Sequence, residues 1–373
     1  MSALDEVIGT ARVVVCCGSG GVGKTTSAAA LGMQAARLGR RAVVVTIDPA
    51  KRLADALGIA GGLTNEPTRL ALDLSGNLSG NLSGNLSGDA PGELWALMLD
   101  AATTFDGLVA ANAGSPEQAE RILANNFYRN VAGSFSGTQE YMAAERLHDL
   151  HLDERFDVVI VDTPPTRNAL DFLDAPGTLT RLLDHPLFRL LMVPTKRGLK
   201  VLNLAAQPLL RTIGKVVGGE VLTDAIAFFQ AFAGMETGFR ERADQVMALL
   251  RSDETKFVLV ASPRSDTVDE ARYFAARLGE SALSVAALVV NRSTPVFGEP
   301  PRRRPTSADK AALYDNLVEL RAMAATERRN LEPLLEFAKT PATWVPLLPG
   351  DVHDLDGLDT IRSLLFAAEP ANG

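Results

Sequence analysis

Cysteine, histidine and aromatic residues are scarce in this chain of 373 residues, which has 2 cysteines, 4 histidines and only 6% Phe, Trp and Tyr. The two cysteines, Cys16 and Cys17, are adjacent, so they cannot form a disulfide framework. The sequence has no Cys-x-x-Cys pair and no Cys/His cluster for zinc or an iron–sulfur centre. The four histidines lack metal-ligand spacing with one another; they are His148, His151, His185 and His353.

Long apolar runs and an excess of positive charge are also missing. The apolar stretches are strand-sized, well short of the roughly 18 residues that a membrane span needs. The N-terminal residues do not combine a basic region with a long apolar core, so they do not resemble a signal peptide. The formal net charge of -8 disfavours a protein that coats nucleic acid or an anionic membrane. We expect a soluble cytoplasmic protein, and we expect no nucleic acid partner.

Short apolar segments alternate with long helical stretches along the chain. Segments that are apolar on both faces are typical of parallel strands covered by helices, and strand–helix alternation of this kind favours a doubly wound α/β fold. The sequence therefore predicts a mostly parallel sheet flanked by helices, within a single domain over residues 1–373. The expected strands are Arg12–Cys17, Ala42–Ile47, Asp157–Val161, Phe257–Ala261, Ala286–Val290 and Thr343–Leu348.

Two regions interrupt the alternation, at about 95–153 and about 185–252, and we expect them to form an inserted helical subdomain. Apolar residues recur at helical spacing in the second region. Four of them could face a hydrophobic client or form the core of the subdomain; they are Phe228, Phe229, Phe232 and Met235. A third segment, 74–89, repeats Leu-Ser-Gly-Asn and is expected to be a flexible surface loop.

The most informative motif lies directly after the first expected strand. Residues Gly18 to Thr25 satisfy the pattern GxxxxGK[ST], with a strand before it and an Ala-rich helix after it. Backbone N–H groups of such a loop converge on phosphate oxygens, and the helix N-terminus adds a favourable dipole. We expect Lys24 to reach the β- and γ-phosphates of a nucleotide and the Thr25 hydroxyl to ligate Mg²⁺. The predicted nucleotide-binding residues of the loop are Gly18, Ser19, Gly20, Gly21, Val22, Gly23, Lys24, Thr25 and Thr26.

Two aspartates follow expected strands and are candidates for the chemistry. Asp162 comes after four apolar residues, which is the Walker-B arrangement that holds Mg²⁺ directly or through water. Asp48 ends the strand that we expect beside the P-loop, where a carboxylate can orient the attacking water. The alternative for Asp48 is an N-cap of the following helix.

These motifs, in this order, resemble the ArsA-type ATPases, which include the arsenite-pump ATPase and the ATPases that target tail-anchored proteins. The resemblance covers most of residues 12–365. It rests on the P-loop and on four further stretches, which are Asp48–Leu57, Asp162–Thr166, Phe257–Pro263 and Val290–Arg292. The resemblance implies a Mg²⁺-dependent ATPase that works as a dimer.

The family resemblance also implies roles for individual residues. Asp48 would orient the hydrolytic water, and Asp162 would belong to the Mg²⁺ site. Asn291 would hydrogen-bond adenine, and the segment that contains Pro346 would close the base pocket. The sequence contains no guanine-specific NKxD motif, so we expect ATP and Mg²⁺ as the ligands.

The sequence departs from the family pattern in the P-loop, where Ser19 replaces the lysine that reaches across the dimer in other members. We therefore expect one of three arrangements. The chain pairs with a paralogue that retains the lysine, or it forms a homodimer in which Lys51 or Arg52 substitutes, or it is a switch with little turnover.

Three functions compete for the helical inserts. The first is coupling of ATP-driven dimer closure to a hydrophobic client or membrane partner. The second is the soluble ATPase subunit of an oxyanion or metal exporter, and the third is positioning in the manner of ParA or MinD. A non-enzymatic ATP-binding scaffold is a fourth alternative. The large inserts favour the first function, because a minimal ParA or MinD domain has no need of them.

Overall fold

The computed structural model describes residues 2–48, 50–72, 92–132, 138–164, 171–184 and 219–367. The chain divides into two compact units. Unit 1 comprises Met1–Met98, Leu150–Leu170 and Asp253–Gly373, and unit 2 comprises Leu99–Asp149 and Asp171–Ser252. The predicted loop 74–89 and much of the predicted insert 185–252 lie outside the described residues.

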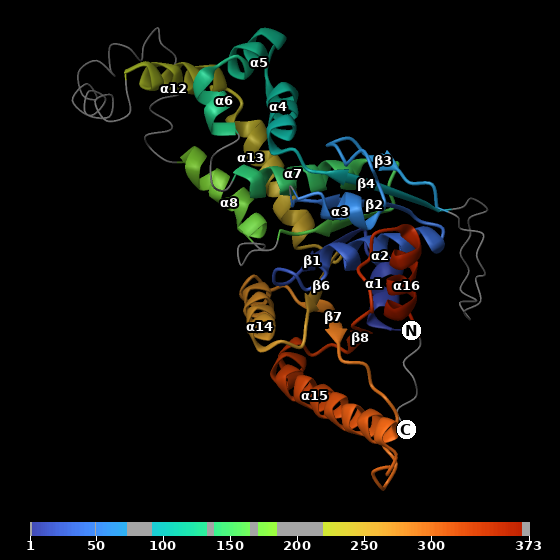
Figure 1. The fold of residues 1–373 in the computed structure, drawn as a ribbon. Coiled ribbons are helices and arrows are strands. Elements are labelled where there is room, and N and C mark those ends of the chain that lie inside the picture. Colours follow the sequence, from blue (N-terminus) through green and yellow to red (C-terminus); the bar gives the residue numbers. More distant parts are fainter. Residues whose placement is uncertain are drawn as a thin grey trace. The chain divides into compact units, whose positions relative to one another are not determined.

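Unit 1 is built on an eight-stranded sheet in the order β3-β4-β2-β5-β1-β6-β7-β8, in which only β3 is antiparallel to its neighbour (Figure 1). This confirms the predicted fold class. The strands are β1 Val13–Cys17, β2 Arg41–Thr46, β3 Thr68–Arg69, β4 Glu93–Met98, β5 Val158–Asp162, β6 Thr255–Ala261, β7 Val285–Ser293 and β8 Ala342–Pro346. All six predicted strands are present, with ends that agree within three residues.

Two findings differ from the sequence prediction. Residues 95–98 belong to strand β4, which pairs with β2, and not to a helical insert. Strand β5 lies between β1 and β2, so the strand that precedes Asp48 is not the direct neighbour of the P-loop strand. Asp162, at the end of β5, is therefore closer in the sheet order to both the P-loop and Asp48 than the sequence suggested.

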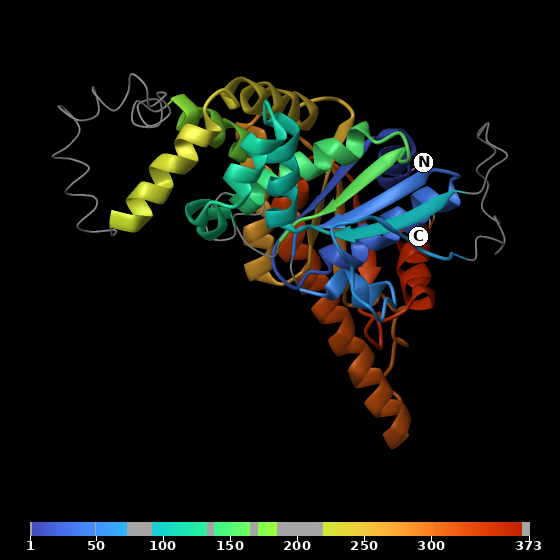
Figure 2. The ribbon, with the colours of Figure 1, turned by 90° about the horizontal axis from the view of Figure 1, so that it is seen from above.

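Helices cover the sheet of unit 1. Alternate residues of the central strands, such as Val14, Cys16 and Val44, pack against α1 Ala3–Thr10, α2 Lys24–Arg37 and α16 Leu355–Leu365. Helix α14 Ser265–Glu280 packs on β6, and α15 Ala308–Ala338 contacts α14 and β7. Figure 1 and Figure 2 both show α15 extending beyond the sheet. The C-terminal helix α16 buries Leu358, Ile361 and Leu365, so its apolar face packs on the core of unit 1.

Unit 2 is helical and has its own apolar core. Its described helices are α4 Ala101–Asn112, α5 Pro116–Leu123, α6 Asn126–Ala132, most of α7 Thr138–Leu152, α8 Asp171–Asp184, α12 Gly219–Phe232 and α13 Glu236–Leu250. Phe228, Phe232 and Met235 are each at most 7% exposed and belong to this core, with Phe229 packed against it. The core alternative is therefore correct for these four residues, and their role as an exposed client surface is not supported. Across the described helices, none is long and apolar enough to cross a membrane.

Candidate nucleotide-binding site

The P-loop connects the end of β1 to the start of α2, as the motif predicts. Gly18 lies so close to β6 that a Cβ atom there would be 2.0 Å from the carbonyl oxygen of Val260, so only glycine fits. Gly23 has φ +94°, and a Cβ atom there would lie 2.2 Å from Nδ2 of Asn291. The two glycines thus allow the loop to pass close to β6 and to the end of β7. The residues between these two glycines form the loop itself. The predicted motif ends in the first turn of α2, which contains Thr25 and Thr26.

Lys24 is folded back onto its own loop. It is only 5% exposed, and Nζ donates to the carbonyl oxygens of Gly18 at 2.9 Å and of Ser19 at 2.7 Å. Burial lowers the pKa of Lys24, while nearby Asp162 acts in the opposite direction. The ammonium group of Lys24 can exchange these carbonyl oxygens for the phosphate oxygens of a nucleotide, because charged phosphate oxygens are stronger acceptors.

Two side chains from different elements, Thr25 of α2 and Thr46 of β2, meet Asp162 at the end of β5. Oδ2 of Asp162 accepts hydrogen bonds from the hydroxyls of Thr25, at 2.8 Å, and Thr46, at 2.9 Å. Its other oxygen, Oδ1, is buried, and within the described part of the chain it has no hydrogen-bond partner. Burial raises the pKa of Asp162 to about 6, against the opposing effect of the two hydroxyls and Lys24.

This arrangement fits the magnesium ion that the P-loop implies. A buried carboxylate oxygen without a protein partner needs a compensating charge or donor. A carboxylate and a threonine hydroxyl are the hard oxygen ligands that Mg²⁺ prefers, directly or through water. Asp162 and Thr25 are therefore suited to hold Mg²⁺.

Asp48 lies two residues beyond β2 and is buried. Its Oδ1 accepts the backbone N–H of Ala50 at 3.0 Å, and its Oδ2 accepts from Nη1 of Arg52 at 2.9 Å. Its own N–H donates to the Thr46 hydroxyl at 3.3 Å. Thr46 therefore links the two aspartates, because the same hydroxyl donates to Asp162.

The end of β7 is fixed to the P-loop. Nδ2 of Asn291 donates to the carbonyl oxygen of Val22, and Nη1 of Arg292 donates to that of Gly21, both at 2.9 Å. Arg292 has φ +60°, a left-handed conformation that is uncommon outside glycine. Pro346, at the end of β8, pairs in register with Ser293, two residues after Asn291 on β7.

Some residues at this site were not predicted from the sequence. Thr46 contacts both aspartates, and Arg292 contacts the P-loop. The hydroxyl of Thr163 donates to the carbonyl oxygen of Cys16 at 2.8 Å. The pattern Thr46-Ile47-Asp48 contained a usable indication, because a polar residue that ends a buried strand can reach a neighbouring strand end. Pro49, Pro165 and Thr166 of the motifs lie outside the described residues.

A comparison with protein families shows which family the chain belongs to. The family model described as anion-transporting ATPase, ArsA type, matches residues 11–366. The chain belongs to the ArsA ATPase family. The protein is therefore an ATPase.

Individual relatives of this ArsA-family protein are distant. A protein of Aquifex aeolicus named "Putative arsenical pump-driving ATPase 1" is 23% identical over 362 residues, which cover 96% of this chain and 80% of that protein. An uncharacterised protein of Streptomyces coelicolor is 28% identical, over 76% of this chain and 63% of its own length. The ATPase get3 of Aspergillus terreus is 25% identical, over 76% of this chain and 73% of its own length.

Proposed function

We propose that this ArsA-family ATPase is a Mg²⁺-dependent switch. Binding and hydrolysis of ATP at the P-loop would close a dimer, and closure would change how the helical unit 2 binds a hydrophobic protein client or a membrane partner. The dimer would contain two copies of this chain, or this chain and a paralogue that has a lysine at the position of Ser19.

One observation on chain connectivity carries the proposal. Residues Leu150–Leu170 belong to unit 1, but both ends of this segment continue into unit 2. The segment contains β5 and Asp162, whose carboxylate contacts the P-loop helix through Thr25. A change at the nucleotide site thus acts on a segment that is covalently joined to unit 2 at both ends.

The chemistry of hydrolysis follows from the charges at the site. Lys24 would leave the carbonyl oxygens of its own loop and bind the β- and γ-phosphates, and the N–H groups at the start of α2 would bind phosphate oxygens. Asp48, whose position is fixed by Ala50 and Thr46, would accept a hydrogen bond from the attacking water. Asn291 and Pro346 would border adenine.

The magnesium ion, when bound, would neutralise charge on the phosphates. Asp162 and Thr25 would hold it. Thr46 would keep the Asp162 carboxylate oriented, because its hydroxyl donates to Oδ2 and leaves Oδ1 available.

An exporter subunit is less well supported than a client-binding ATPase. Cys16 and Cys17 are fully buried in β1, and burial raises the pKa of both thiols, to about 12 for Cys17. Protonated, buried thiols are poor ligands for soft metals and arsenite, because the thiolate is the ligand form. Across the described ranges, no group of three His, Cys, Asp or Glu residues is placed to hold a metal ion.

The proposal is tested by measuring ATP hydrolysis and mass by light scattering, with and without a detergent-solubilised hydrophobic helical peptide. The expected results are dimer formation with a non-hydrolysable ATP analogue and a change in hydrolysis rate with the peptide. Lys24→Ala serves as the control that should remove both effects. If arsenite or antimonite stimulates hydrolysis and the peptide does not, the exporter function is correct instead.

A further inference from the structure

Lys51 and Arg52 are adjacent basic residues, but only Arg52 forms a salt bridge with Asp48, the residue proposed to orient the attacking water. Arg52 is the first residue of the short helix α3 Arg52–Ala56, and its guanidinium contacts Oδ2 of Asp48 at 2.9 Å. The side chain of Arg52 is 56% exposed, whereas that of Asp48 is 11% exposed. An exposed cation is therefore bound to a largely buried carboxylate.

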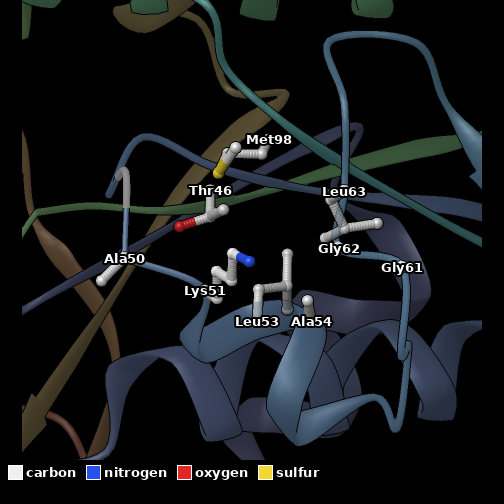
Figure 3. A pocket seen from close by; sticks show the side chains of 9 residues that line it. All are labelled: Thr46, Ala50, Lys51, Leu53, Ala54, Gly61, Gly62, Leu63 and Met98. Atoms are coloured by element: carbon white, nitrogen blue, oxygen red, sulfur yellow. The ribbon is translucent and has the colours of Figure 1, made fainter.

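Lys51 precedes Arg52 but lies in different surroundings. It lines a pocket together with Thr46, Leu53 and Leu63, among other residues. Figure 3 shows its ammonium group directed into this pocket. Of the two substitutes considered for the missing P-loop lysine, Arg52 is thus the one that contacts Asp48.

The carboxylate of Asp48 is engaged by protein donors at both of its oxygens. Each carboxylate oxygen already accepts one hydrogen bond, Oδ1 from Ala50 and Oδ2 from Arg52. A carboxylate that is paired with a guanidinium is a weaker acceptor for water, because part of its charge is neutralised. Lys24 is likewise held by carbonyl oxygens of Gly18 and Ser19, so both cations are bound to protein acceptors.

The γ-phosphate of ATP can compete for the guanidinium. Its planar donors match a phosphate in two-point geometry, and a doubly charged phosphate is a stronger partner than one carboxylate oxygen. The exposed side chain of Arg52 can move with little loss of packing. Asp48 cannot follow it, because the N–H groups of Asp48 and Ala50 fix the turn.

We infer that Arg52 is a positioning residue that restrains Asp48 until ATP binds. It then moves from the carboxylate to the γ-phosphate, which frees Asp48 for the attacking water and supplies within one chain the positive charge that Ser19 lacks. In the reaction, the water oxygen forms a bond to the γ-phosphorus. The bond from phosphorus to the bridging oxygen breaks with its electron pair remaining on ADP, and a proton of the water passes to the released phosphate. This inference rests on the proposed role of Asp48.

The test compares Arg52→Gln and Arg52→Lys with the matched control Lys51→Gln, after melting curves have shown that all are folded. Single-turnover hydrolysis and the affinities for ADP and for a non-hydrolysable ATP analogue are measured. Arg52→Gln is expected to slow single turnover by roughly 10³-fold, the lower end of the effect of losing an arginine finger. It should also reduce the preference for the ATP analogue over ADP by about tenfold, since it removes a contact to the γ-phosphate. Arg52→Lys should restore part of both.

Two results would overturn the inference. One is an unchanged preference for the ATP analogue over ADP in Arg52→Gln, which would indicate a structural role only. The other is an equal loss of hydrolysis in Lys51→Gln and Arg52→Gln. Failure of the underlying proposal is recognised separately, because Asp48→Asn would then hydrolyse ATP at the wild-type rate whatever the Arg52 variants show.

Discussion

The side-chain amide of Asn291 donates to the carbonyl oxygen of Val22 at 2.9 Å, and this contact joins the end of β7 to the P-loop. Its other half, Oδ1, accepts the backbone N–H of Arg292 at 2.9 Å, so the amide has a fixed orientation. Each half keeps one further hydrogen-bonding position, which the proposed contact with adenine would use.

The first prediction concerns the space between Gly23 and Asn291. Gly23→Ala places a methyl group about where Nδ2 of Asn291 lies, on a residue with φ +94°. We expect nucleotide affinity to fall by at least about tenfold, as for the loss of one good contact. Gly21→Ala is the matched control, because Gly21 also has a positive φ, +75°, but nothing lies within 4 Å of its added Cβ. Equal losses in both variants, measured by titration with a fluorescent ATP analogue, would show that backbone strain and not the Asn291 contact is responsible.

A second prediction follows from the raised pKa of Asp162. The folded protein retains this proton up to a pKa of about 6, whereas the ordinary value is 3.8. Between these values the unfolded chain binds fewer protons, so this group makes stability fall as pH rises from about 4 to 6. Asp162→Asn should remove this component, which amounts to about 3 kcal/mol over the whole range. Urea unfolding of both proteins at pH 4, 5, 6 and 7, without nucleotide or metal, measures the difference. A difference in unfolding free energy that is constant with pH would contradict the prediction.

Metal binding should reverse this behaviour in the wild type. Mg²⁺ with an ATP analogue favours the ionised form of Asp162, so the stabilisation by ligand should increase with pH through about 6. Asp162→Asn should show a much smaller increase.

The third prediction concerns a buried ion pair in unit 2. Glu145 is 1% exposed, and it accepts hydrogen bonds from the Tyr141 hydroxyl and from Nε of Arg242, which also binds Asp149. Arg242→Met leaves a buried carboxylate without its cation and should destabilise unit 2 by about 3–5 kcal/mol. Arg240 lies on the same helix as Arg242, and Arg240→Met, which breaks an exposed pair with Asp184 of α8, should cost at most about 1 kcal/mol. Thermal unfolding followed by circular dichroism distinguishes the two, and similar shifts would contradict the assignment of Glu145 as the costly partner.

The sequence predicted the sheet and the P-loop because both depend on local pattern. Strands such as Val13–Cys17 are apolar on both faces, and the glycines of the loop are required by contacts that any P-loop makes. Strand β4 was missed because Glu93–Met98, without β-branched residues, reads equally well as part of a helix. The hydrogen bonds that pair β4 with β2 stabilise the extended conformation, which the local sequence does not favour by itself.

The aromatic row of unit 2 shows a different limit. Phe229, Phe232 and Met235 recur at helical spacing, but Gly234 adopts φ +93° and separates α12 from α13. The glycine was a usable indication of the break. Whether such a row is a core or a surface depends on the helices around it, which sequence spacing alone does not place.

Contacts between distant segments were the hardest to predict. The pair of Asp48 and Arg52 has i,i+4 spacing and was within reach of sequence reasoning. The contact of Arg292 with Gly21 joins residues 271 positions apart and depends on the left-handed backbone of an arginine. No propensity predicts that conformation.

The last prediction concerns Ser19, where the family has a lysine. Ser19 is only 2% exposed, and in the described part of the chain its hydroxyl has no hydrogen-bond partner. If Arg52 supplies the positive charge from within the same chain, Ser19→Lys adds a charge that is not needed. Single-turnover hydrolysis should then stay within about threefold of wild type, whereas a site that lacks its cation should gain roughly 10³-fold or more, the order of an added arginine finger. The double variant Ser19→Lys with Arg52→Gln should recover hydrolysis relative to Arg52→Gln alone, and only at protein concentrations that allow dimers, because this lysine would act across the interface.

A large gain in Ser19→Lys alone would instead favour a heterodimer whose partner provides the lysine. Recovery in the double variant that is independent of protein concentration would exclude action across an interface.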